Sequence, residues 1–494
     1  MITILTTIDH KISIEKMIAT VDRLDELVTV STGGLQVKAS EKLITVENNT
    51  IQCNIDWHDT EVPILFQDHA LNEGNLLAIV HYKLGNQQRA FEFIQNDNPL
   101  HNELLAGTYL QYEYAFSQPL NEAIQKTSLH NAAVVYHYGA QETPSDLETA
   151  QAKYERALKD NVSDEVKAFT SKHYVNFLLD AGDFKSAETV AEAYLTEGLS
   201  NEAKNALLIQ KANAMIGQLL VPYNTEKLDA ILNILQDGIE FYEEKQLNIN
   251  AALLAVDASE MANYKSDFIT AKELINKAIL HFRNAEIPEF LGEATLKKAI
   301  LLYTWSKNGS PQYYKAAINA FQDSLKVFKR DTHPRKFADI HHNLALIYSE
   351  IPVSPEEKPI WTAFCASSFK EVLAFYNKKE YPYEFAMASH NYATALIDFP
   401  EAKLHDNLAK ANRLFKDALS VRTAESFPFE RALTRLNQLE LAWRSHNENS
   451  AQEQVKISEM EQMAKEIKTL VTDRQLLTQA NEHLTRIEQL KTLI

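Results

Sequence analysis

Two arginines, Arg431 and Arg435, have the spacing best suited to binding chemistry in this chain. In a helix, side chains at positions i and i+4 project from the same face. Both guanidinium groups then reach a single carboxylate and form the paired hydrogen bonds that arginine favours. The spacing therefore predicts a site for a carboxylate or an acidic stretch of chain. The alternative is a solvated pair of arginines matched to Glu430 or Glu440.

Residues for catalysis or metal binding are harder to assemble. His341, His342 and His390 could be metal ligands, but adjacent histidines point to different faces of a helix and no cysteine or acid stands at ligand spacing. Cys365 lacks a glycine-framed nucleophile turn. The sequence contains no glycine-rich phosphate loop, no Gly-x-Ser-x-Gly elbow and no His-Glu-x-x-His motif. We therefore predict no catalytic residues, no metal, no cofactor and no enzyme activity.

The segments that carry these residues repeat along the chain. Related stretches begin at Phe337 (Phe-Ala-Asp-Ile-His-His-Asn-Leu-Ala), at Phe385 (Phe-Ala-Met-Ala-Ser-His-Asn-Tyr-Ala) and, less well preserved, at Phe429 (Phe-Glu-Arg-Ala-Leu-Thr-Arg-Leu), with steps of 48 and 44 residues. A period of this size is typical of stacked helical hairpins, each of which buries its apolar face against its neighbours. Arrays of this kind usually bind other molecules and catalyse no reaction.

A second pattern marks the helices that must approach each other closely. A small residue is followed four positions later by a large apolar residue and three positions after that by another small one, so all three lie on one helix face. The pattern occurs at Ala150-Tyr154-Ala157, Ala271-Ile275-Ala278, Ala317-Phe321-Ser324 and Ala411-Phe415-Ala418, and with a larger third residue at Cys365-Phe369-Val372. We predict that these are the second helices of successive hairpins. Gly85 and Gly182 are expected to end first helices in the left-handed conformation.

The chain resembles the tetratricopeptide repeat superfamily over about residues 71–446. The resemblance is carried by Pro334, Asn343-Leu344-Ala345, Tyr348, Phe369, Val372 and Leu373. The stretch from His333 to Tyr348 is similar to the longer repeats of kinesin light chains and of bacterial repeat proteins that accompany caspase-like domains. The resemblance implies an all-α fold, a right-handed superhelical solenoid of antiparallel helix hairpins. It also implies that the first helix of each hairpin lines a concave groove.

Mapped onto the repeats, the resemblance places six candidate partner-binding residues on this groove. They are His342, Asn343, His390, Asn391, Arg431 and Arg435. An asparagine in such a groove brackets the backbone of an extended peptide through its amide donor and acceptor. The two arginines look like part of a carboxylate clamp, although His342 replaces the usual lysine and Leu346 stands where a second asparagine is expected. The alternative for the asparagines is a ladder of hydrogen bonds that ties one hairpin to the next without a ligand.

Charge and composition narrow the class of partner. The chain has 49 basic and 67 acidic residues and a net charge of −18, which repels nucleic acid and anionic lipid over most of the surface. Its two cysteines, Cys53 and Cys365, cannot form a disulfide framework, as is usual in a reducing cytoplasm. No run approaches the ~18 apolar residues of a membrane-spanning helix. We expect a cytoplasmic protein that contacts neither nucleic acid nor membrane.

Both ends of the chain differ from the repeats. In residues 1–70, short β-branched segments at 2–6, 34–37, 43–47, 50–55 and 62–66, with a helix over 14–27, predict a small α+β head. In residues 447–494, apolar residues recur at steps of three and four, with a change of phase at Thr472-Asp473-Arg474. This pattern predicts one or two amphipathic helices that cap the array, with self-association or docking to a partner helix as the alternative.

The function that these patterns favour is that of a protein-binding scaffold, adaptor or regulatory subunit. It would hold another protein or a peptide in the groove, with an acidic segment or a C-terminal carboxylate as the expected partner chemistry. The alternative is a ligand-gated or peptide-gated regulator, in which occupancy changes the superhelix pitch and thereby a caspase-like or other effector protein. An enzyme with its site in the head is the third hypothesis.

Overall fold

The computed structural model describes all residues except 34–41, 143–145, 401–405, 446–448 and 493–494. Contacts divide the chain into two compact units, Met1–His281 (unit 1) and Phe282–Ile494 (unit 2). Each unit has its own hydrophobic clusters. Among the described residues, no helix combines the length and the apolar character needed to cross a bilayer.

Unit 1 begins with a five-stranded sheet in the order β2-β1-β3-β4-β5. The strands β1 and β2 are parallel, as are β1 and β3, whereas β4 and β5 run antiparallel to their neighbours. Ile4, Ile44 and Ile51 of the sheet are completely buried and share one cluster with Leu76 and Leu77 of the first long helix after it. The strands are β1 (Ile2–Thr6), β2 (Val28–Ser31), β3 (Lys42–Glu47), β4 (Thr50–Cys53) and β5 (His69–Ala70). The sheet is therefore packed directly on the start of the helical array.

Two details predicted for the head are wrong. The helix α1 is Ile8–Ala19, not 14–27, because Arg23 adopts a left-handed conformation and Val28–Ser31 pairs with β1 as β2. Residues 62–66 form no strand; the chain turns between Val62 and Ile64, and side chains of a helix bind its backbone in place of a neighbouring strand. The predicted segment 34–37 lies outside the described residues.

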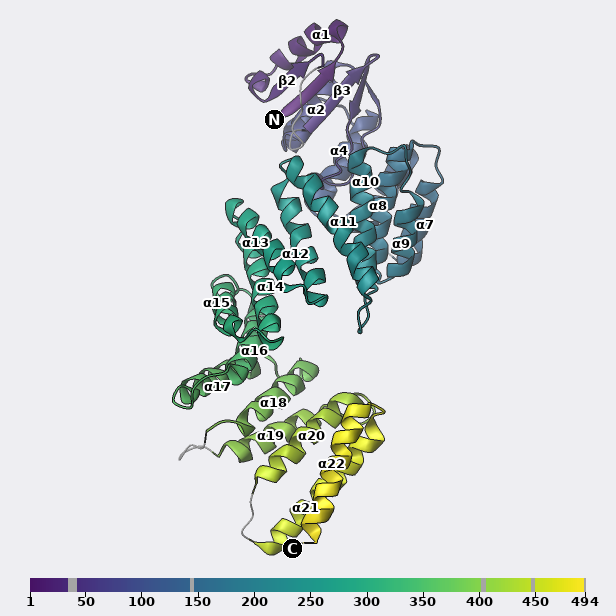
Figure 1. Cartoon of the computed structure of the whole chain (residues 1–494). Helices are drawn as coiled ribbons and strands as arrows, with labels where there is room; N and C mark the ends of the chain where they lie inside the picture. The colour runs from purple at the N-terminus through teal and green to yellow at the C-terminus, as the bar shows by residue number, and fades with distance from the viewer. Residues whose placement is uncertain (34–41, 143–145, 401–405, 446–448, 493–494) are drawn as a thin grey trace. The chain divides into compact units, whose positions relative to one another are not determined.

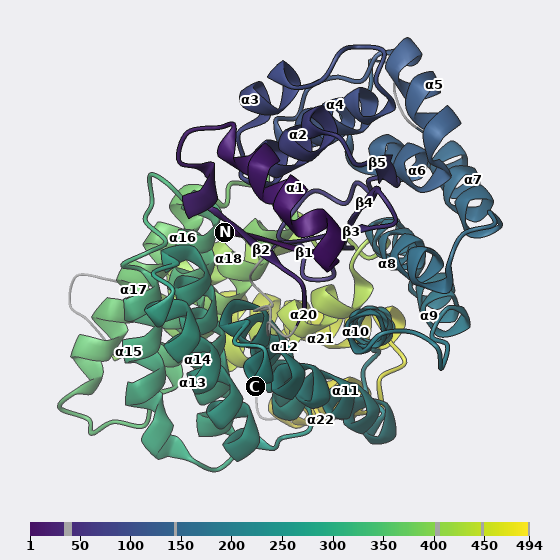
Figure 2. The same cartoon turned by 90° about the horizontal axis from the view of Figure 1, so that it is seen from above.

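After the sheet, unit 1 consists of helices in antiparallel pairs, and α6, α7, α8 and α9 follow one another side by side (Figure 2). Most begin at a polar N-cap whose side chain accepts a backbone N–H, as Ser163 does for α8. The pairs are α2 (Glu73–Lys83) with α3 (Gln87–Glu92), α4 (Pro99–Gln111) with α5 (Gln118–Thr127), α6 (Leu129–Tyr138) with α7 (Leu147–Leu158), α8 (Asp164–Asp180) with α9 (Phe184–Ala193) and α10 (Asn201–Gly217) with α11 (Thr225–Glu244). The helix α12 (Asn248–Tyr264) precedes α13 (Phe268–Asn284), in which the boundary between the units falls.

Unit 2 continues with longer pairs, several of which begin with a proline at the first helical turn, where its missing N–H costs nothing. The pairs are α14 (Pro288–Lys307) with α15 (Tyr314–Ser324), α16 (Pro334–Glu350) with α17 (Lys358–Phe375), α18 (Pro382–Ile397) with α19 (Asn407–Leu419) and α20 (Pro428–Arg444) with α21 (Ser450–Leu470). The last helix, α22 (Arg474–Lys491), packs on both α20 and α21 (Figure 1). Ile457, Met460, Ile467 and Ile487 are buried in that contact.

The pattern of small and large apolar residues confirms the expected packing. Every residue of the five predicted stripes is at most 4% exposed. The stripes lie on α7, α13, α15, α17 and α19, each of which follows a first helix in the chain. The small residues let the two helices of a pair approach, while the large one fills the space between neighbouring pairs. The predicted all-α fold of tetratricopeptide-like hairpins with a small head is confirmed.

Several of the turns that follow first helices use a left-handed closing residue, as predicted for Gly85 and Gly182, at φ 82° and 76°. Elsewhere the same position is held by a residue with a side chain, such as Ser266 at φ 62°, after which the N–H of Asp267 donates to the carbonyl oxygen of Ala262. The left-handed conformation costs a non-glycine residue about 1–2 kcal/mol.

Replacing Ser266 with glycine should therefore raise the free energy of unfolding by about 0.5–1 kcal/mol, since glycine's extra freedom in the unfolded chain offsets part of the gain. Gly182→Ser is the matched reverse change, because no atom lies near the position of its missing Cβ. We expect it to be destabilising by a similar amount in urea unfolding. A gain from Gly182→Ser would contradict this account of the turns.

Candidate functional site

The two predicted arginines do share one carboxylate, and it belongs to the chain itself. On α20, Arg431 Nε lies 2.6 Å from Oε1 of Glu466, and Arg435 Nε lies 2.8 Å from its Oε2. Glu466 is on α21, so neither Glu430 nor Glu440 is the counter-ion. Burial lowers the pKa of Arg435, and the charge of Glu466 opposes that shift. A partner carboxylate at this pair would have to compete with Glu466, and binding here stays a prediction.

Glu466→Gln should reduce the free energy of unfolding by about 1–2 kcal/mol, because two largely covered guanidinium groups lose their counter-charge. The three side chains are only 18–27% exposed. Glu459→Gln on the same helix, at an exposed position, is the control and should change stability by less than about 0.5 kcal/mol. Equal effects of the two substitutions in urea unfolding would show that the shared carboxylate does not hold α21 on α20.

The other four predicted residues lie on α16 and α18, where most of them connect first helices. Asn391 Nδ2 donates to Nε2 of His342, 2.9 Å away, and thereby joins α18 to α16. His390 continues the connection toward α20, with its Nδ1 3.1 Å from Oγ1 of Thr434. Asn343 differs, since its Nδ2 donates to the carbonyl oxygen of Asp339 in its own helix, at 2.9 Å. The ladder alternative thus describes Asn391, and peptide contact by Asn343 or Asn391 stays a prediction.

A further member of this ladder, Asn437, was not predicted. Asn437 Nδ2 donates to Oγ1 of Thr394, 2.8 Å away, and lies 3.4 Å from Nε2 of His390. Asn437 stands two residues beyond the position that matches Asn391 in the repeat, so the repeat register does not reveal it. Burial of this region lowers the pKa of His342 to about 4 and that of His390 to about 3. Both rings are therefore neutral at pH 7.

The groups considered for other chemistry are poorly placed for it. Burial raises the pKa of the Cys365 thiol to about 12 and that of Cys53 to about 11, so neither forms a thiolate nucleophile at neutral pH. Across the described part of the chain, no three His, Cys, Asp or Glu side chains converge as metal ligands do. His341, His342 and His390 are accordingly not assembled into a metal site.

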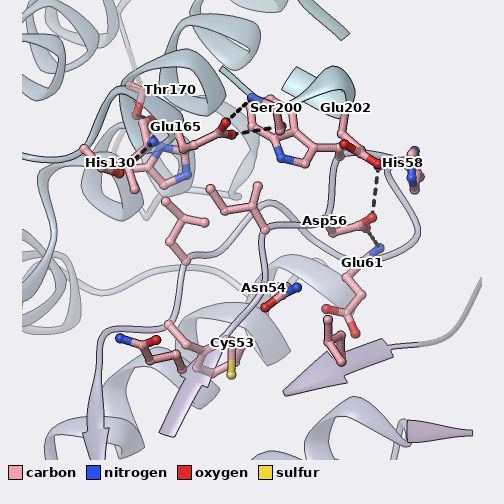
Figure 3. Close-up of a pocket in the computed structure, with 18 of the residues that line it drawn as sticks. Cys53, Asn54, Asp56, His58, Glu61, His130, Glu165, Thr170, Ser200 and Glu202 are labelled. Carbon is pink, nitrogen blue, oxygen red and sulfur yellow. Dashed lines mark hydrogen bonds between the residues drawn. The ribbon is translucent and has the colours of Figure 1, made fainter. Parts of the chain in front are cut away.

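A large cavity in unit 1 was not predicted. It measures ≈ 1750 Å³ and lies between the connection from β4 to β5 and the N-terminal ends of α6, α8 and α10. Figure 3 shows Asn54, Asp56 and Glu61 along that connection, with Glu165 and Ser200 on the helices. Glu165 accepts the backbone N–H of Ser200 at 2.5 Å, so part of the acidic lining stabilises helix ends.

One wall of this cavity is a stretch of chain without helix or strand, residues 56–67, which we call segment 56–67. It turns at Trp57 and His58 and again between Val62 and Ile64. It crosses the first helices of successive pairs. At one end Trp57 packs edge-on against Phe169 of α8, with ring centroids 5.3 Å apart. At the other end the backbone N–H of Gln67 donates to Oε2 of Glu103 on α4, at 3.2 Å. Side chains of α4, α6, α8 and α10 that contact this segment form what we call the first-helix surface of unit 1.

The centre of segment 56–67 is held through its backbone. Asn131 of α6 brackets Leu65: its Oδ1 accepts the Leu65 N–H at 2.8 Å, and its Nδ2 donates to the Leu65 carbonyl oxygen at 2.7 Å. The neighbouring His130 donates from Nε2 to the carbonyl oxygen of Pro63 at 3.0 Å. These contacts do not depend on the side chains of the segment. The pair of hydrogen bonds made by Asn131 has the geometry that the sequence led us to expect between an asparagine of this fold and the backbone of a bound peptide.

The signal that could have identified this site is a third copy of a short motif. His130-Asn131-Ala132-Ala133 repeats the His-Asn-x-Ala of His342-Asn343-Leu344-Ala345 and of His390-Asn391-Tyr392-Ala393. In all three copies the final alanine is completely buried. The motif thus occupies related first-helix positions in both units, and in unit 1 its asparagine holds an extended backbone.

No protein-family model and no curated protein matches this sequence. Among solved structures, the apo form of the quorum sensor NprR from B. thuringiensis covers 75% of this chain and 99% of its own length, at 13% identity and a TM-score of 0.45. A human IFIT1 dimer with m7Gppp-AAAA covers 85% of this chain and 90% of its own length, at 15% identity and a TM-score of 0.37. Yeast Tom70 covers 85% of this chain and 82% of its own length, at 13% identity and a TM-score of 0.35. Such low scores support no conclusion about function, and the fold assignment rests on the helix pairs and buried stripes of this chain.

Proposed function

We propose that this chain is a protein-binding scaffold or regulatory subunit that holds an extended segment of a partner along the first helices of its hairpins. The observation that carries the proposal is the Asn131 bracket, in which a first helix of this fold binds extended polypeptide through its backbone. Recognition of this kind requires little rearrangement of the protein, so little of the binding energy is lost to ordering.

The proposed partner site is on α16 and α18, where Asn343 and Asn391 stand in the motif that contains Asn131. Both side chains are partly exposed, whereas Asn131 is only 1% exposed beneath segment 56–67. Each already donates one amide hydrogen within the chain. Their Oδ1 atoms would accept N–H groups of a bound backbone, as Oδ1 of Asn131 accepts that of Leu65. Arg431 and Arg435 would add a preference for acidic partners only where Glu466 is displaced.

The test is selection of random 12-residue peptides displayed on phage against the full chain. Selected peptides should bind the Asn343→Ala, Asn391→Ala double variant at least about 10-fold more weakly, because two bracketing amides are lost. Asn412→Ala, an exposed asparagine on the second helix α19, is the matched control and should leave the affinity unchanged. Peptides that bind all three proteins equally would overturn the proposed site.

A gated regulator is the second candidate function. It is supported by unit 1, where segment 56–67 of the chain itself occupies the first-helix surface. A partner that binds this surface would have to displace the segment, and that displacement would be the regulatory change. The acidic or C-terminal carboxylate partner, the effector protein, self-association through α21 and α22, and the cytoplasmic location stay predictions.

A further inference from the structure

We propose that segment 56–67 is an internal ligand of unit 1, and that the first-helix surface beneath it takes, in exchange, a partner segment of the same chemistry. That chemistry is an aromatic residue with acids two and four positions later, followed by a stretch held through its backbone. The inference goes beyond the proposed function, because it concerns a second site in a different unit of the chain.

The aromatic requirement follows from the slot that Trp57 fills. Trp57 is 7% exposed and shares a cluster with apolar residues of α8 and α10. The lining residues are Ala168, Phe169, Leu199, Ala203, Ala206 and Leu207. Without an occupant, this slot would expose apolar surface that a large aromatic ring covers well. An aliphatic or polar residue would leave part of it exposed.

The acidic requirement follows from Lys172 of α8. Its side chain is only 4% exposed, and its ammonium lies 2.6 Å from Oδ1 of Asp59, whose side chain is 65% exposed. A buried ammonium without a counter-charge is strongly unfavourable. Any chain that replaces segment 56–67 must therefore supply a carboxylate near this point, and the spacing from Trp57 to Asp59 sets it two residues after the aromatic. A second acid of the segment, Glu61, lies 2.7 Å from the ammonium of Lys83 on α2, whose side chain is only 4% exposed, so a replacing chain must supply a carboxylate there as well.

The contacts to the backbone, by contrast, accept many sequences. Asn131, His130 and Glu103 bind the backbone of Leu65, Pro63 and Gln67, respectively. Segment 56–67 is neither helix nor strand, and its own hydrogen bonds are local, such as those from the N–H groups of His58 and Glu61 to the carboxylate of Asp56. Its ends connect to the short strands β4 and β5. The ≈ 1750 Å³ cavity along one side provides the space into which the segment can lift or an incoming chain can enter. Exchange thus replaces one set of equivalent contacts with another.

The test uses the full chain and a fluorescein-labelled synthetic peptide of residues 54–68. Trp57→Ala with Asp59→Ser removes the two side-chain anchors of the internal copy on α8 and opens the surface there. The opened variant should bind the peptide about 100-fold more tightly than the unaltered chain, in which the tethered copy competes at an effective concentration on the order of millimolar. Equal binding by the two proteins, or no binding to a folded opened variant, would overturn the proposal.

Two controls place the peptide on unit 1. Adding Lys172→Gln to the opened variant, or alanine at the tryptophan of the peptide, should reduce binding at least about 10-fold. Asn343→Ala with Asn391→Ala should leave it unchanged, because those residues belong to unit 2. If the Asn343→Ala, Asn391→Ala substitutions abolish binding of this peptide, the peptide binds at the site of the proposed function and the inference is contradicted. A negative result with the phage-selected peptides would not contradict it, because that experiment tests the site in unit 2.

If the opened variant fails to fold, hydrogen exchange in the unaltered chain tests whether segment 56–67 detaches while the rest of unit 1 stays folded. The amide of Leu65 should exchange through local opening, at least about 10-fold faster than that of Val175 in the core of α8. Exchange of both amides only with global unfolding would show that segment 56–67 is a fixed part of the core.

Discussion

Phe369→Ala should lower the free energy of unfolding of unit 2 by about 3–5 kcal/mol, the usual cost of emptying a buried aromatic position. Phe369 is completely buried on α17. It stacks on Tyr392 of the next first helix, with centroids 4.7 Å apart, and its ring lies 6.0 Å from that of His342. One side chain therefore connects three helices. Its loss leaves a cavity between two hairpins that cannot close without moving both.

Phe364→Ala is the matched control for this substitution. Phe364 lies on the same helix, but it is 49% exposed and only flanks Tyr348 and Trp361. We expect a loss of no more than about 1 kcal/mol in urea unfolding monitored by circular dichroism. Similar losses from the two substitutions would mean that the repeated stripe is not what holds neighbouring hairpins together.

Acidification should destabilise both units between about pH 6.5 and pH 4. Burial lowers the pKa of His130 and of His342 from 6.5 to about 4. In that interval the unfolded chain binds protons that the folded chain does not, so the free energy of unfolding falls as the pH falls. The stabilisation is complete above pH 6.5, and each histidine accounts for up to about 3 kcal/mol, at 1.36 kcal/mol per pKa unit.

His342→Gln isolates this effect from the titration of carboxylates. The Oε1 atom of glutamine can accept the amide hydrogen of Asn391 that Nε2 of His342 accepts now, and it has no proton to gain. The variant should lose less stability than the unaltered chain between pH 7 and pH 4.5 in thermal unfolding. Identical pH dependence of the two proteins would show that protonation of this ring is not linked to unfolding.

The repeated helices could be predicted from sequence because their signal is local. Ala411, Phe415 and Ala418 stand at helical spacing, and that spacing alone requires one shared face and close approach to a neighbour. The same holds for Arg431 and Arg435, whose common carboxylate was expected. The identity of that carboxylate could not be predicted, since Glu466 lies on a different helix, 35 positions from Arg431, and no spacing rule connects these positions.

The head shows where local signals fail. Val62, Ile64 and Phe66 alternate as a strand does, but the N–H of Ile64 donates to the carbonyl oxygen of Val62 at 2.7 Å and the chain turns there. Whether its backbone pairs with another strand or with side chains of helices depends on residues such as Asn131, which is 66 positions from Leu65. The alternation of apolar residues is a local pattern, so the sequence predicted a strand here, whereas the structure shows a non-helical stretch bound by helix side chains.

Photo-cross-linking tests most directly whether first helices hold a partner chain. A benzoylphenylalanine at Met387, which lies one turn before Asn391 on α18, should cross-link a phage-selected peptide in good yield. The same residue at Asn412, on the outer helix α19, should not. Cross-links at position 412 with none at 387 would contradict the account, because the partner would then lie on the second helices.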